Sequence, residues 1–139
     1  MKTLKTILLG LALIITANVV KADDKEKLTK DHAISTYIDA IAHGKPDGLN
    51  EVLDSDVKFS MMRGNTVLSY GKSEMLKSLS ASKNTEQDCT VNTTTVESNN
   101  EVAIVKVDLQ YAGFTRSNLV TISNTGNGWK ITTVHSVFK

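Results

Sequence analysis

The sequence predicts an α+β fold in which helices cover one face of an antiparallel sheet. The stretch 87–138 contains four runs rich in Val, Ile, Thr and aromatic residues with short turns between them, a pattern typical of successive β-strands. Nearer the amino terminus, apolar residues recur at the i, i+3, i+4 and i+7 spacing of one helical face. The predicted order is helix, helix, hairpin, helix and four strands, or ααββαββββ.

The first helix is predicted within 25–43. Its apolar stripe consists of Ile34, Tyr37, Ile38 and Ile41. Acidic residues precede the stripe, while Gly44 and Pro46 follow it, and both arrangements favour helix ends at these positions. Such a stripe needs an apolar surface to cover, and the predicted sheet supplies one.

Three short elements are predicted between this helix and the sheet. Pro46 begins a second helix at its first position. The alternating run 57–62, a turn at Gly64 and Asn65, and the return run 66–70 together indicate a hairpin at the edge of the sheet. A third helix is expected at 74–80.

The four strands are expected at 87–96, 102–111, 114–123 and 129–138. A two-residue turn at 112–113 places Tyr111 opposite Phe114 and thereby sets the register of the middle pair. One face of that pair is then mainly apolar and contains Ala103, Val105, Val107, Leu109, Tyr111, Phe114, Arg116, Asn118, Val120 and Ile122. The opposite face is polar and suits water.

The last strand has two possible registers, and the larger apolar set decides between them. This set puts Trp129, Ile131, Thr133, His135 and Val137 on the inner face and leaves a four-residue loop at 125–128. His135 is then expected opposite Asn118, one residue pair away from Arg116. Polar side chains on an apolar face must be paired or hydrated, so these three residues predict a small pocket.

The amino-terminal segment 1–22 is predicted to be a cleaved signal peptide. A short basic start precedes an apolar run that ends at Val20-Lys21-Ala22, where small residues suit a signal peptidase. Residues 23–139 then form a single domain that is exported to the periplasm or the extracellular space, without membrane association after cleavage.

Composition excludes several functional classes. Three of the 16 basic residues lie in segment 1–22, so the rest of the chain has 13 Lys and Arg against 15 Asp and Glu. A near-neutral chain without a basic run argues against a nucleic-acid partner. The single Cys89 cannot form an internal disulfide. No cluster of His, Cys, Asp and Glu has metal-ligand spacing, and no phosphate loop is present, so neither a metal nor a cofactor is predicted.

Four short motifs, in this order and spacing, resemble the nuclear transport factor 2-like superfamily. They are Tyr37-Ile38-Asp39 with Gly44, Leu53-Asp54-Ser55-Asp56-Val57, Gly71-Lys72, and Gly128-Trp129-Lys130-Ile131. The chain looks most like small exported bacterial members grouped as putative lumazine-binding proteins. The resemblance implies a cone in which a strongly curved sheet of about six strands wraps around a long amino-terminal helix, with a pocket between sheet and helix.

The superfamily includes enzymes, namely ketosteroid isomerase, SnoaL-type polyketide cyclases and scytalone dehydratase. The resemblance matches the isomerase's helix tyrosine to Tyr37. It places the catalytic base near Met61 and the catalytic acid within 118–120, where this sequence has no Asp or Glu. A thioether cannot accept a proton from carbon, so the resemblance does not extend to isomerase chemistry.

Arg116 is the most informative candidate, because a buried guanidinium without an anion is costly. Three explanations are open. Water can reach it, a carboxylate such as Asp108 or Glu101 can pair with it, or an anionic ligand can bind it. The first two are favoured from sequence alone, just as a helix tyrosine such as Tyr37 packs more often than it binds.

Three functions remain. The favoured one is a non-catalytic binding domain for a small, partly apolar ligand, with an anion as one option. Its predicted site consists of Tyr37, Tyr111, Arg116, Asn118, Trp129 and His135. The second is a homodimer through the outer sheet face, with Leu119, Val134 and Phe138 in the interface. The third is a cyclase or dehydratase with His135 as the base.

Overall fold

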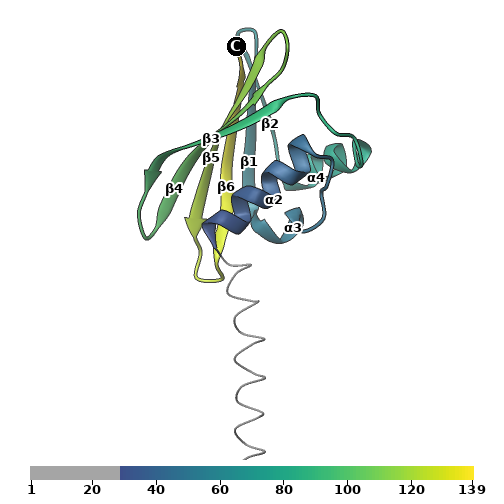
Figure 1. The fold of residues 1–139 in the computed structure, drawn as a ribbon. Helices are drawn as coiled ribbons and strands as arrows, with labels where there is room; N and C mark the ends of the chain where they lie inside the picture. The colour runs from purple at the N-terminus through teal and green to yellow at the C-terminus, as the bar shows by residue number, and fades with distance from the viewer. Residues whose placement is uncertain (1–28) are drawn as a thin grey trace, which may run out of the picture.

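The computed structural model describes residues 29–139 and shows three helices and one six-stranded sheet in this range (Figure 1). The helices are α2 (Lys30–Ala42), α3 (Leu49–Val52) and α4 (Lys72–Ala81). The strands are β1 (Leu53–Arg63), β2 (Thr66–Tyr70), β3 (Thr90–Ser98), β4 (Val102–Gln110), β5 (Thr115–Asn124) and β6 (Trp129–Phe138). The predicted α+β class with six strands is confirmed, whereas the predicted signal peptide lies outside the described residues.

The sheet is curved and mixed, with the strand order β2-β1-β6-β5-β4-β3. Only the contact between β1 and β6 is parallel. The helices lie on one side of the sheet, which we call the inner face (Figure 1). The β1–β2 turn, the β4–β5 turn and the carboxyl terminus lie together at the end of the sheet that extends beyond the helices (Figure 1). None of the described helices has the length and apolar content to cross a membrane.

The core lies between α2 and the inner face. Strands β4 and β5 contribute alternate residues to it, as predicted from their period of two. The buried side chains from these strands and from α2 include Val105, Val107, Leu109, Val120, Ile122, Ala33, Tyr37 and Ile41. The Tyr111 N–H donates to the Phe114 carbonyl at 2.9 Å, so the predicted two-residue turn is also confirmed.

A β-bulge in β6 overturns the predicted register of its second half. Ile122 lies opposite Ile131, but Thr121 lies opposite Thr133, so Thr132 is an extra residue on β6. The extra residue lets Ile131 and Val134, three positions apart, both face the core. His135 therefore lies on the outer face, and the prediction that it lies opposite Asn118 is wrong.

The same bulge changes the predicted dimer surface. Leu119 is on the outer face, opposite His135, and 41% of its surface is exposed. Val134 is buried in the core, and Phe138 lies opposite Arg116 on the inner face. The prediction that Val134 and Phe138 belong to the outer face is therefore wrong.

The carboxyl end of α2 is clamped to the segment that leads into β3. Gly44 has a left-handed φ of +64°, and its carbonyl accepts a hydrogen bond from the Asn84 N–H at 2.8 Å. The Ala42 carbonyl accepts from the Gln87 N–H at 2.8 Å. His43 Nδ1 lies 2.7 Å from Glu86 Oε1. These contacts hold the 84–89 segment beside the inner face.

Candidate functional site

The part of the inner face that extends beyond the helices presents two adjacent rows of side chains. Strand register places Leu68 opposite Met61, Met61 opposite Ser136, and Ser136 opposite Asn118. In the next row, Arg116 lies opposite Phe138. Directly paired residues in a sheet share a face, so these side chains from four strands border one region.

A cavity of about 450 Å³ occupies one side of this region. It is lined by Met61, Met62, Arg63, Gly64, Leu68 and Phe138. Leu68 is 37% exposed and Phe138 is 48% exposed, so apolar surface faces the opening. The volume is within the range of about 300–1,000 Å³ that is usual for small-molecule sites.

Two hydrogen-bond donors without partners lie in the same part of the fold. The Tyr37 hydroxyl, from α2, and Arg116 Nε, from β5, are the buried side-chain polar atoms that lack a hydrogen-bond partner among the described residues. A buried donor left unpaired costs about 1–3 kcal/mol. A ligand atom that accepts from either donor would recover part of this cost.

The pKa of Tyr37 is set by its burial and by two neighbouring side chains. Burial raises this pKa from 10.0 to about 12, the nearby Arg116 guanidinium opposes the rise, and Tyr70 adds to it. Tyr70 stacks on Phe59 with ring centroids 6.1 Å apart. The Tyr37 phenol thus keeps its proton at neutral pH and is a donor close to a cation.

Arg116 has no carboxylate partner in the described part of the chain. Asp108, one of the predicted partners, accepts a hydrogen bond from Ser117 on the outer face and pairs with Lys106 at 3.6 Å. Glu101 lies in the β3–β4 turn, at the opposite end of β4 from the residue that pairs with Arg116. The explanation by an internal ion pair is therefore wrong.

Tyr111 forms an aromatic wall beside Arg116. Its hydroxyl donates to Gln87 Oε1 at 3.1 Å, and its ring stacks on Phe114 with centroids 4.6 Å apart. Phe114 in turn contacts Phe138 at 6.2 Å between centroids. Burial raises the pKa of Tyr111 and that of the neighbouring Cys89 thiol. The Tyr111 hydroxyl is already used, so its ring is the part available to a ligand.

Asn118 uses its side chain to join three strands. Its Nδ2 donates to the Val107 carbonyl at 3.1 Å, and its Oδ1 accepts from Ser136 Oγ at 2.6 Å. The residue is fully buried. Asn118 lies in the predicted site, but these bonds give it a structural role beneath Arg116 and Phe138.

Trp129 lies at the other end of the inner face. Lys30 Nζ is 4.8 Å from the centroid of its ring and donates to Ser98 Oγ at 2.9 Å. A smaller cavity of about 260 Å³ is found at this end, between the start of α2 and strands β3 to β5. The structure thus brings together Tyr37, Tyr111, Arg116 and Asn118 and separates Trp129 and His135 from them.

The sequence prediction placed none of the cavity-lining residues in the site. It missed Met61, Met62, Arg63, Gly64, Leu68 and Phe138, and also Tyr70, Ser136 and Gln87 of this region. Leu68 and Tyr70 alternate on the return strand of the predicted hairpin, so pairing that hairpin about its Gly-Asn turn would have placed them with Met61. Phe138 and Ser136 had no such signal, because only the bulge turns them inward.

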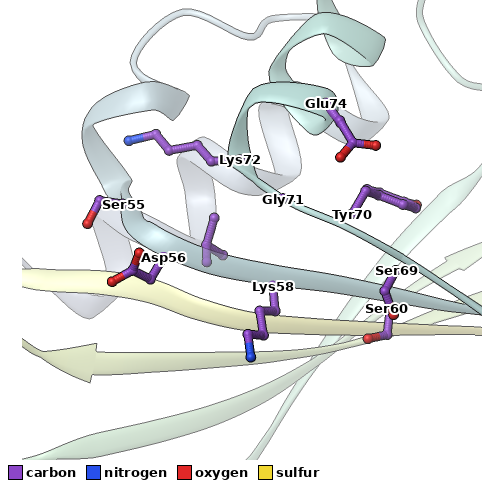
Figure 2. Close-up of a pocket in the computed structure, with 10 residues that line it drawn as sticks. Ser55, Asp56, Lys58, Ser60, Ser69, Tyr70, Gly71, Lys72 and Glu74 are labelled. Atoms are coloured by element: carbon purple, nitrogen blue, oxygen red, sulfur yellow. The ribbon is translucent and has the colours of Figure 1, made fainter.

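Figure 2 shows a separate and larger hollow, of about 850 Å³, between β1, the end of β2 and the start of α4. Charged side chains of both signs line it, namely Asp56, Lys58, Lys72 and Glu74. Lys72 points away from Lys58, and its ammonium donates to the Leu53 carbonyl at 3.1 Å. Because its charges are of both signs, we place the candidate site instead at the cavity of about 450 Å³, one of whose lining residues, Phe138, is the strand partner of Arg116.

Comparison with known sequences identifies the family. The family described as "Putative lumazine-binding" matches residues 24–138. The chain belongs to this family. The predicted resemblance is therefore confirmed over nearly the whole described fold. No curated protein matches the sequence significantly.

Solved structures share the fold of this family member at low sequence identity. An NTF-2 like protein of unknown function from Silicibacter pomeroyi DSS-3 has a TM-score of 0.67 and 14% identity, over 83% of this chain and 97% of its own. A putative dehydratase of the NTF2-like family from Streptomyces avermitilis has a TM-score of 0.56 and 19% identity, over 83% of this chain and 96% of its own. A putative ketosteroid isomerase from Parabacteroides distasonis has a TM-score of 0.55 and 17% identity, over 76% of this chain and 84% of its own. These likenesses establish an NTF2-like fold.

Proposed function

We propose that this protein is a small-molecule-binding domain whose ligand binds on the inner face, between Tyr37 of α2 and Arg116 of β5. The observation that carries the proposal is the pair of buried donors without partners, the Tyr37 hydroxyl and Arg116 Nε. Their environment is otherwise satisfied, since Asn118, Ser136 and Tyr111 all have hydrogen-bond partners. A ligand with one acceptor group would complete the hydrogen bonding of the site.

The chemistry of the two donors defines that acceptor. A guanidinium and a protonated phenol both donate and neither needs to accept, so a carboxylate or a carbonyl oxygen fits them. The family description names lumazine, whose ring carbonyls are acceptors of this kind. The family name and the donor pair thus support the same general class of ligand.

Binding without catalysis is the better reading of the site. Met61 stands on the inner face where the resemblance implies a base, and it cannot take a proton. His135, the base in the enzymatic alternative, is on the outer face opposite Leu119. That alternative therefore loses the geometry it requires, because its base and Tyr37 lie on opposite sides of the sheet.

We place the working protein outside the cytoplasm on the basis of the 1–22 pattern. Protein purified from its own host should then begin at Asp23. An amino terminus at Met1 on the purified protein would contradict export by this route.

Native mass spectrometry tests the binding proposal. Protein purified from its own host should retain a small-molecule adduct, and the adduct should be lost from Arg116→Gln and reduced in Tyr37→Phe. Loss of a charge-assisted hydrogen bond corresponds to about a tenfold to hundredfold weaker affinity.

His135→Gln is the matched control, since it changes a polar residue of the outer face on the same sheet. It should retain the adduct at the wild-type level. A wild-type protein without an adduct, or an adduct kept equally by Arg116→Gln, would overturn the proposal.

A further inference from the structure

We infer that the ligand is an amphipathic anion, with a carboxylate or similar head at Arg116 and Tyr37 and an apolar tail in the groove between the β1–β2 hairpin and Phe138. This inference rests on the proposed function and adds the chemical class of the ligand. The groove is the cavity of about 450 Å³ lined by Met61, Met62, Arg63, Gly64, Leu68 and Phe138.

Exposed apolar side chains gather at this end of the sheet. The exposed large hydrophobic residues of the described chain are Val67, Leu68, Val96, Phe114, Leu119 and Phe138. All except Val96 and Leu119 belong to the β1–β2 hairpin, the β4–β5 turn or the end of β6, which lie together beyond the helices (Figure 1). Leu68 and Phe138 line one cavity, and Phe114 contacts Phe138, so these three side chains offer apolar surface to a ligand on the inner face.

The charged side chains nearest the groove are basic. The segments 57–73 and 109–139, which form β2, β5, β6 and most of β1, contain no Asp or Glu. Arg63 lines the groove, and Arg116 is the direct strand partner of Phe138, which also lines it. The carboxylate of Glu86, near the end of α2, is engaged by His43. These basic side chains favour an acceptor group that carries a negative charge over a neutral one.

Head and tail positions are adjacent. Phe138 lines the groove and is also the direct partner of Arg116 on the neighbouring strand. Neighbouring strands lie about 5 Å apart, so one small molecule spans both positions. The two methionines of the groove have flexible thioether side chains that adapt to tails of different shape.

The test is a titration of the purified protein with butanoate, hexanoate and octanoate, and with octanol as the neutral counterpart of octanoate. Each methylene buried in the groove should tighten binding about threefold to fourfold. Octanoate should thus bind on the order of 100-fold more tightly than butanoate, and at least about tenfold more tightly than octanol, which lacks the charge for Arg116.

Two groove variants, Leu68→Ser and Phe138→Ser, should weaken octanoate binding at least about fivefold and weaken butanoate binding by a smaller factor, because butanoate has four fewer methylenes to bury in the groove. Both residues are partly exposed, so we expect the fold to tolerate each change, and one variant suffices if the other fails to fold. The control is Val96→Ser on the opposite edge strand β3, where an exposed apolar residue is removed without effect on any alkanoate.

The outcomes separate this inference from the proposed function. If all alkanoates bind with one affinity, and Arg116→Gln weakens each of them, the acceptor site stands and the apolar tail is wrong. If chain length matters but Leu68→Ser and Phe138→Ser behave like Val96→Ser, the tail lies elsewhere and the inference is also wrong. If no alkanoate binds, or none responds to Arg116→Gln, the amphipathic anion is wrong, whereas the proposed function fails only if protein from its own host also carries no adduct that depends on Arg116.

Discussion

At the scale of single residues, the protein has two buried polar groups that do not stabilise its fold. The Tyr37 hydroxyl is fully buried without a partner, so it costs free energy of folding and contributes no hydrogen bond in return. Arg116 carries a similar cost at Nε. Residues that lower stability in this way are usual at binding sites, where contact with the ligand matters more than packing in the core.

Replacing Tyr37 with Phe should therefore leave the protein at neutral pH as stable as the wild type, or up to about 1 kcal/mol more stable. The variant should also respond differently to alkali. Because the folded pKa of Tyr37 is raised to about 12 from 10.0, the unfolded chain loses this proton first, and the free energy of unfolding falls as pH rises from 10 toward 12. This loss amounts to about 1.4 kcal/mol per pH unit.

Urea denaturation of both proteins at pH 8, 10 and 11 measures the difference. The variant should lose less stability than the wild type above pH 10, because it lacks the titrating phenol. Parallel pH profiles for the two proteins would show that Tyr37 is not buried as described.

At the scale of secondary-structure elements, two local features position the site. The bulge at Thr132 decides which residues of β6 reach the inner face, and thereby places Ser136 and Phe138 there. The turn at Gly44 ends α2 and holds the 84–89 segment, which includes the Gln87 partner of Tyr111.

The turn makes a prediction with a matched control. Gly44 and Gly64 have the same φ of +64°, but a Cβ at Gly44 would lie 2.5 Å from the Thr85 nitrogen, whereas a Cβ at Gly64 meets no atom within 4 Å. Gly64→Ala should cost about 1–2 kcal/mol from backbone strain alone. Gly44→Ala should cost more than this, because backbone atoms must also move apart. Equal costs in urea denaturation would contradict the close approach.

At the scale of the whole molecule, the sheet has a protected centre and two weak edges. Strands β5 and β6 have a neighbour on each side and residues in the core, whereas β2 pairs with β1 alone and four of its five residues are exposed. Stability against local opening follows buried contacts, so the edge strands β2 and β3 should open before β5 and β6.

Hydrogen–deuterium exchange should show this order. Amides of β5 and β6 should exchange only through global unfolding of the protein, and those of β2 should exchange faster, through local opening. Saturation with octanoate should slow exchange in β2 and at the end of β6, beside the groove, and leave β3 unchanged. Uniform protection across the sheet, or an octanoate effect confined to β3, would contradict this view of the molecule.

Much of this fold was predictable because its signals are local. The alternation in β4 and β5, the turn at 112–113 and the four-residue loop at 125–128 follow from residue types within a few positions of one another. The inner-face positions of Tyr37, Arg116 and Asn118 followed from the same periodicities. In these elements only one assignment of faces is possible, because the opposite assignment would place polar side chains in the core.

The rest was decided by tertiary packing. The bulge in β6 depends on Ile131 and Val134 both finding core partners across the sheet, and no pattern within the strand marks Thr132 as the extra residue. The parallel contact of β1 with β6 joins segments far apart in the sequence, and it places Met61 beside Ser136 and Asn118. The sequence by itself determined which residues face inward along each regular strand. Only the tertiary structure decided which of these residues lie side by side. The neighbour of each strand, and the one-residue change of register at the bulge, depend on contacts between strands that no local pattern contains.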